Sequence, residues 1–147
     1  MANADFWNQR YAEAGFAYGM EPNDFLRQQA PGLEAGRALC LAEGEGRNAV
    51  YLASLRHAVI AQDLSDVGLS KARQLAAERG LSIETLCCDL AEYTPEPESV
   101  DLVVAIWMHL PPALLIEPEE PRSELEGLEW LVLQEQRRWA LGRNPLA

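Results

Sequence analysis

Residues 37–49 read Arg-Ala-Leu-Cys-Leu-Ala-Glu-Gly-Glu-Gly-Arg-Asn-Ala, and this stretch decides the fold. The continuous apolar run at residues 38–42 is typical of a strand buried on both faces. Gly44 and Gly46 then predict a tight turn, after which apolar residues recur at helical spacing. A buried strand, a glycine turn and a helix in this order indicate the first unit of a parallel α/β sheet.

The same alternation continues to residue 106. Further strands are expected at residues 57–61, which end at Gln62-Asp63, and at residues 81–87 and 100–106. A helix capped by Ser65 or Asp66 and ended by Gly80 lies between the second and third strands. The sequence therefore predicts an α/β fold with a Rossmann-like, doubly wound, mostly parallel sheet that is truncated after strand four.

The whole chain, residues 1–147, is expected to form one domain in three parts. Residues 1–36 form a helical N-terminal segment, with helices at about residues 5–14 and 25–30, the second capped by Asn23 or Asp24. Residues 37–110 form the sheet core. Residues 111–147 form a shortened C-terminal part, with a short helix at residues 122–126 and a last strand at residues 128–133.

Composition excludes several classes of partner. Twelve basic and twenty-three acidic residues give a net charge of −11, which disfavours binding to nucleic acid. No signal peptide is apparent, and no apolar run approaches the roughly 20 residues that cross a bilayer, so we expect a cytoplasmic protein without membrane contact. The three cysteines, an odd number, are expected to be reduced and mostly buried.

Three features are expected to meet at the carboxyl edge of the sheet, where ligands of such folds bind. The first is the turn containing Gly44 and Gly46, which either admits a ligand or serves only as a strand-to-helix turn. The second is Asp63, which either accepts hydrogen bonds from ribose hydroxyls or caps the following helix. The third is Asp89, at the end of the third strand, which either accepts from an adenine amine or is a solvated loop acid.

Residues 41–53, together with Asp63-Leu64-Ser65, resemble the class I S-adenosylmethionine (SAM) methyltransferases. Within them the chain is most similar to the tellurite-resistance and thiopurine methyltransferase-like group. Two further segments carry this resemblance. One is the aromatic N-terminal segment, with Phe6-Trp7, Arg10-Tyr11 and residues 18–23, and the other is residues 106–112. The resemblance covers residues 5 to about 113.

The resemblance implies SAM as the cofactor and assigns its contacts. Gly44 and Gly46 would shape the loop under the methionine part, Asp63 would hold the ribose, and Asp89 would accept from the adenine amine. The N-terminal aromatic segment would close over the site as a lid, or would cover a face of the sheet as an ordinary helix. The full set of implied cofactor-binding residues is Tyr18, Ala42, Glu43, Gly44, Gly46, Asp63, Leu64, Asp89, Leu90, Ile106 and Trp107.

The chain departs from the family pattern at the loop and after Pro112. Cys40 stands where an acid is expected and Ala42 where a glycine is, so Glu43 is a hypothetical substitute that would bind the methionine amino group. The family's fifth strand and closing hairpin have no clear counterpart here. We therefore expect an open sheet edge, which another copy of the chain would cover in a homo-oligomer.

The resulting functional prediction is methyl transfer from SAM to a small-molecule acceptor. The only titrating side chain near strand four is His109, which would act as the base or would be hydrogen-bonded in the turn before Pro111. Two alternatives remain open: a catalytically inactive, shortened SAM-binding or interaction domain, and a nicotinamide dinucleotide-binding fragment.

Overall fold

A computed structural model describes residues 3–93, 95–96 and 98–106 of the chain. Several predictions concern residues outside these ranges. They are the roles of Trp107 and His109, the helix at residues 122–126, the strand at residues 128–133, and the open sheet edge in that region.

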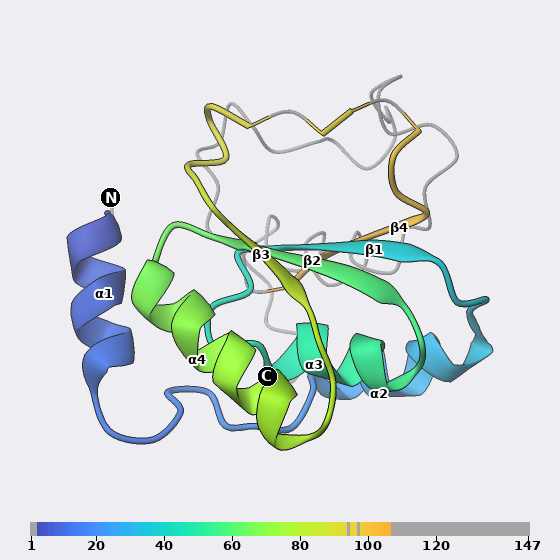
Figure 1. Ribbon diagram of the computed structural model, residues 1–147, viewed down its shortest axis with the longest axis horizontal. Coiled ribbons are helices and arrows are strands. Elements are labelled where there is room, and N and C mark those ends of the chain that lie inside the picture. Colours follow the sequence, from blue (N-terminus) through green and yellow to red (C-terminus); the bar gives the residue numbers. More distant parts are fainter. Residues whose placement is uncertain (1–2, 94, 97, 107–147) are drawn as a thin grey trace, which may run out of the picture.

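Four parallel strands form the central sheet, in the order β3-β2-β1-β4 (Figure 1). Their bounds are β1 Arg37–Leu41, β2 Ala58–Asp63, β3 Glu84–Cys87 and β4 Leu102–Ala105. The predicted α/β fold and the parallel sheet are thus confirmed. β3 begins later than expected because the Leu81 amide donates to Ala76 O at 2.8 Å and so belongs to the end of the preceding helix.

The strand order places the point of reversal between β1 and β4. Helices α3 (Arg47–Ser54) and α4 (Asp66–Glu78) connect β1 to β2 and β2 to β3 on one face of the sheet. The connection from β3 to β4 runs on the opposite side (Figure 1). A crevice for a ligand is expected outside the carboxyl ends of the strands at such a reversal.

The main core lies between the sheet and the helices on that face. Cys40 on β1, Leu52 on α3 and Leu69 on α4 belong to this core and are completely removed from solvent. Helix α2 (Asp24–Gln29), which is followed by a 3-10 turn at Ala30–Gly32, contributes the equally buried Leu26. Asn23 caps α2 through its side-chain oxygen, which accepts from the amides of the helix's first turn.

Helix α1 (Ala4–Ala12) packs beside α4 and does not lie directly on the sheet (Figure 1). The Ser65 hydroxyl, which caps α4 by accepting from Gly68 N at 3.1 Å, donates to the Asn8 side chain at 2.6 Å. This contact joins the start of α4 to α1. The alternative of an ordinary helix on a sheet face is therefore wrong for α1.

The cysteines differ in exposure. Cys40 is buried in β1, Cys88 is half-buried, and Cys87 is exposed, and all three are free thiols. The expectation of mostly buried thiols is wrong for Cys87, which is the last residue of β3 at the end of the strand order. Among the described residues, no helix is long and apolar enough to span a membrane.

Candidate functional site

The loop from β1 to α3 turns at two glycines with left-handed backbone conformations. Their φ angles are +67° for Gly44 and +94° for Gly46, a region that favours glycine. A Cβ on Gly44 would lie 2.6 Å from the Tyr11 hydroxyl, and one on Gly46 would lie 2.6 Å from the Ala72 Cβ. Backbone conformation and packing within the chain are therefore sufficient reasons for glycine at both positions.

Asp63 ends β2 and binds the glycine loop directly. Its Oδ2 accepts from Gly44 N at 2.8 Å and its Oδ1 accepts from Ser65 N at 2.9 Å, and the residue is 6% exposed. Burial raises the pKa of Asp63, and these backbone hydrogen bonds oppose the shift. Because Ser65 caps α4, Asp63 is not its N-cap. Its remaining lone pairs can accept from further donors.

Glu43 caps helix α3, a role that its sequence position alone does not indicate. Its Oε1 accepts from Asn48 N at 2.9 Å and Ala49 N at 2.7 Å. Its other oxygen has no hydrogen-bond partner among the described residues. Burial raises the pKa of Glu43 to about 7, against the lowering effect of these two amides and of Arg47.

Gln62 connects the ends of three strands and was not among the predicted site residues. Its Oε1 accepts from Ala42 N at 3.0 Å, and its Nε2 donates to Cys88 O at 2.7 Å. The Cys88 amide in turn donates to Asp63 O at 3.1 Å. These bonds bring the ends of β1, β2 and β3 together, and with them the glycine loop, Asp63 and the residue before Asp89.

Tyr11 is the second residue that the sequence did not single out for the site. It is buried, its hydroxyl lies against Gly44, and Trp7 stacks on its ring with centroids 5.6 Å apart. Burial and the nearby Asp63 raise the pKa of Tyr11. Helical spacing and the family resemblance placed Tyr11 in the first helix and in the aromatic N-terminal segment, but its contact with the loop is long-range and no local pattern predicts it.

The other predicted residues differ in their environments. Asp89 is exposed, and its Oδ1 accepts from Ala91 N at 2.9 Å, so it opens a turn after β3. Leu64 and Leu90 are half-buried, whereas Ile106 is buried with the main core. Tyr18 is 55% exposed, and its ring lies 5.8 Å from the Arg10 guanidinium.

Residues 38–117 match the profile of a family described as a methyltransferase domain. The match covers more than half of the chain and includes the glycine loop, Asp63 and Asp89. The chain belongs to the methyltransferase domain family.

Solved structures agree with the fold. A protein from work on the conversion of a disulfide bond into a thioacetal group during echinomycin biosynthesis is 26% identical, with a TM-score of 0.61 over 71% of this chain and 47% of that one. A SAM-dependent methyltransferase from Thiobacillus denitrificans, in complex with S-adenosyl-L-homocysteine, is 23% identical, with a TM-score of 0.56 over 74% and 45%. TehB from Haemophilus influenzae is 21% identical, with a TM-score of 0.51 over 70% and 34%.

This methyltransferase domain thus spans less than half the length of each of these three proteins. None of the curated proteins matches its sequence.

S-adenosylmethionine is the cofactor of the family, and the residues present fit it. The ribose hydroxyls, the methionine ammonium and the adenine amine of SAM are all hydrogen-bond donors. The carboxyl edge of this sheet presents three carboxyl groups, on Glu43, Asp63 and Asp89, along neighbouring strand ends, and each accepts hydrogen bonds when ionised. The donor and acceptor chemistries are therefore complementary.

Proposed function

We propose that this methyltransferase domain binds SAM along the carboxyl edge of its sheet and transfers the methyl group to a small-molecule acceptor. The observation that carries the proposal is the buried carboxylate of Asp63. It is fixed between the glycine loop and the start of α4 by two backbone amides, at 2.8 and 2.9 Å. Both donors are amides, and among the residues that the structure describes no cation pairs with Asp63, so its carboxylate retains lone pairs for ribose hydroxyls.

The flanking residues receive the remaining parts of the cofactor in this proposal. Glu43, whose second carboxylate oxygen lacks a described partner, binds the methionine ammonium, and the loop of Ala42, Gly44 and Gly46 lies under the methionine chain. Asp89 accepts from the adenine amine between the half-buried side chains of Leu64 and Leu90. The family resemblance places Ile106 and Trp107 beside the sulfonium and assigns Tyr18 to the N-terminal segment that closes over the site.

Bound SAM supplies a methyl group already activated on a sulfonium, so the chain needs to align the acceptor and exclude water. We assign His109 the role of accepting a proton from acceptors that are not already anionic. The acceptor class, a chalcogen oxyanion or a thiol, rests on the resemblance to the tellurite-resistance and thiopurine group. If His109→Ala leaves turnover unchanged at saturating acceptor, the base role is excluded.

The test of the proposal is formation of S-adenosylhomocysteine from SAM with thiol, oxyanion and amine acceptors, measured alongside equilibrium SAM binding. Asp63→Asn is expected to weaken SAM binding by at least about tenfold, because it replaces a charged acceptor with an amide. The matched control is Asp66→Asn, three residues away, whose exposed carboxylate pairs only loosely with Arg73 at 3.6 Å.

The outcomes separate the alternatives. Binding with product formation supports the proposed enzyme. Tight SAM binding with no product from any acceptor class favours an inactive SAM-binding domain. Full SAM affinity in Glu43→Gln contradicts the proposal that Glu43 binds the methionine ammonium. It does not contradict the other proposed cofactor contacts.

A further inference from the structure

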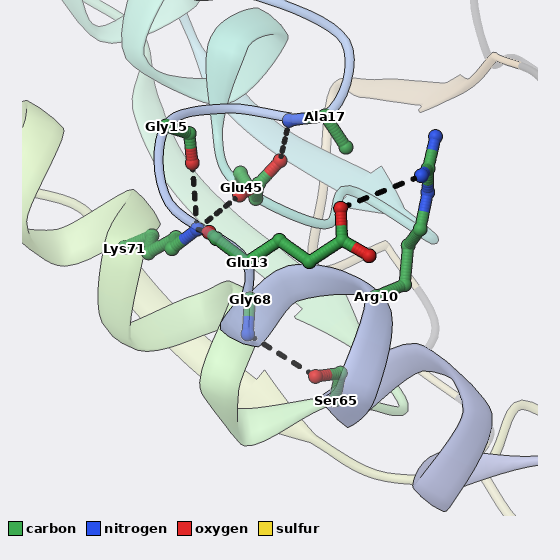
Figure 2. Close-up of polar contacts among 8 residues, drawn as sticks. All are labelled: Arg10, Glu13, Gly15, Ala17, Glu45, Ser65, Gly68 and Lys71. Atoms are coloured by element: carbon green, nitrogen blue, oxygen red, sulfur yellow. Dashed lines mark hydrogen bonds and ion pairs between the residues drawn. The ribbon is translucent and has the colours of Figure 1, made fainter.

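Lys71 on α4 binds the segment that joins α1 to α2, residues 13–17, which we call the N-terminal strap. Its ammonium nitrogen lies 2.8 Å from Glu13 O, 2.7 Å from Gly15 O and 2.9 Å from Glu45 Oε2 (Figure 2). An ammonium carries three N–H donors, so all of them are used. Lys71 is also the only lysine of the 147 residues.

Glu45 completes this connection from the glycine loop. Its side chain is 5% exposed, and its Oε1 accepts from Ala17 N at 2.7 Å while Oε2 binds Lys71 (Figure 2). Both carboxylate oxygens therefore bind the strap or its lysine. This differs from Glu43, two residues earlier, which caps α3 with a single oxygen.

The strap lies between the parts of the N-terminal segment that approach the cofactor loop. Tyr11, just before it, places its hydroxyl against Gly44. Tyr18 directly follows it, and further along Asn23 N donates to Asn48 Oδ1 on α3 at 2.8 Å. Anchoring the strap therefore fixes both Tyr11 and the segment after Ala17 relative to the loop from which the proposed site is built.

We propose that Lys71, acting through Glu45, is a positioning residue that holds the N-terminal strap closed against the glycine loop and so retains bound cofactor. This inference rests on the proposed function and adds to it the residue that controls closure of the N-terminal segment. Lys71 does not touch the cofactor; it acts through the strap and through Glu45. Breaking the contact leaves a nearly buried Glu45 carboxylate without its cation, which is costly.

Dissociation of S-adenosylhomocysteine from the full chain, followed by stopped flow, tests the proposal. Lys71→Met is expected to speed dissociation by at least about tenfold, since truncating one partner of a buried charge pair acts mainly on the off-rate. Arg73→Met is the control, because it removes the same charge from the same helix, and within the described residues the Arg73 guanidinium binds only Asp66 and Thr85. Its dissociation rate is expected to match that of the unsubstituted chain.

A second measurement uses the unsubstituted chain and remains informative if Lys71→Met does not fold. Because Lys71 is the only lysine, an amine-acylating reagent followed by mass spectrometry reports on its ammonium group alone, with the N-terminal amine as internal reference. Saturating S-adenosylhomocysteine is expected to slow acylation of Lys71 by at least about tenfold, because modification requires the strap to open. A purely structural lysine would give no ligand-dependent protection.

The results separate the two proposals. If the unsubstituted chain binds neither SAM nor S-adenosylhomocysteine, the proposed function is wrong, and so is the positioning role of Lys71 that rests on it. If it binds, but Lys71→Met dissociates at the unsubstituted rate, or bound ligand leaves acylation unchanged, the positioning role alone is overturned. Faster dissociation in Lys71→Met but not in Arg73→Met, together with ligand protection of Lys71, supports it.

Discussion

Glu43 couples the ionisation of one carboxyl group to the stability of the glycine loop. One oxygen of Glu43 caps α3, and burial raises its pKa to about 7. Cys40, where related sequences are expected to carry an acid, is buried and free. In this chain the turn after β1 carries the acid Glu43, which binds amides in the first turn of α3.

This raised pKa predicts how stability depends on pH. The Glu43 carboxyl binds its proton more tightly in the folded chain than in the unfolded one. Its contribution to the free energy of unfolding is therefore complete below about pH 4.5 and is lost as pH rises toward 7. The buried Asp63 shifts in the same direction. We expect the free energy of unfolding to fall by about 1–2 kcal/mol between pH 5 and pH 7.5, a value reduced for partial exposure of Glu43.

Urea denaturation at several pH values, without ligand, measures this dependence. Glu43→Gln keeps an oxygen that can accept from Asn48 N and Ala49 N but cannot ionise, so most of the slope is expected to disappear. A Glu43→Gln variant with an unchanged slope would show that another group is responsible.

The sequence predicted some of these residues and missed others for a physical reason. Asp63 could be found because it follows directly from the end of a strand that periodicity identifies, and such ends meet at one edge. Gln62 and Tyr11 could not, because their contacts join residues 20 to 33 positions apart, as with Gln62 to Ala42 and Tyr11 to Gly44. No local pattern reports such contacts.

At the scale of the elements, Gln62 holds the carboxyl ends of the strands in register. Its amide group satisfies Ala42 N after β1 and Cys88 O after β3. Both partners lie beside residues of the proposed cofactor site, Glu43 and Asp89. The spacing of the predicted carboxylates therefore depends on a side chain that does not contact the ligand in our proposal.

Replacing this side chain should destabilise the fold. Gln62→Leu leaves the Ala42 amide and the Cys88 carbonyl without their partner, which is expected to cost about 1–3 kcal/mol of unfolding free energy. Gln74→Leu is the control, because Gln74 makes an exposed contact with Glu78 at 3.2 Å. Chemical denaturation of the two variants compares them, and equal stabilities would contradict the role of Gln62.

The elements themselves were predicted more accurately than their boundaries. All four strands were predicted, and Asn23 and Ser65 were each one of two candidates for a helix cap. These features could be predicted because strand burial and helix capping depend on a few neighbouring residues. The start of β3 was placed too early, since the apolar Leu81 resembles a strand residue although its amide closes α4. The packing of α1 on α4 also needed the structure, because it depends on the contact of Asn8 with Ser65.

At the scale of the whole molecule, the net charge of −11 acts on any ligand that carries a positive charge. SAM has a sulfonium, which S-adenosylhomocysteine lacks. We expect the affinity for SAM to fall several-fold between about 20 mM and about 500 mM salt, because the Debye length shortens to a few ångströms. The affinity for S-adenosylhomocysteine is expected to change less, and calorimetry at the two salt concentrations measures both. Equal salt dependence would show that the field of the protein does not act on the sulfonium.

The central claim, that the carboxyl edge of this sheet is a SAM site, is tested most directly by calorimetric titration of the full chain with SAM and, separately, with NADH. We predict binding of SAM at one site per chain, weakened by Asp63→Asn but not by Asp66→Asn, and no heat of binding from NADH. Binding of NADH without binding of SAM would contradict the account and favour a nicotinamide dinucleotide-binding fragment.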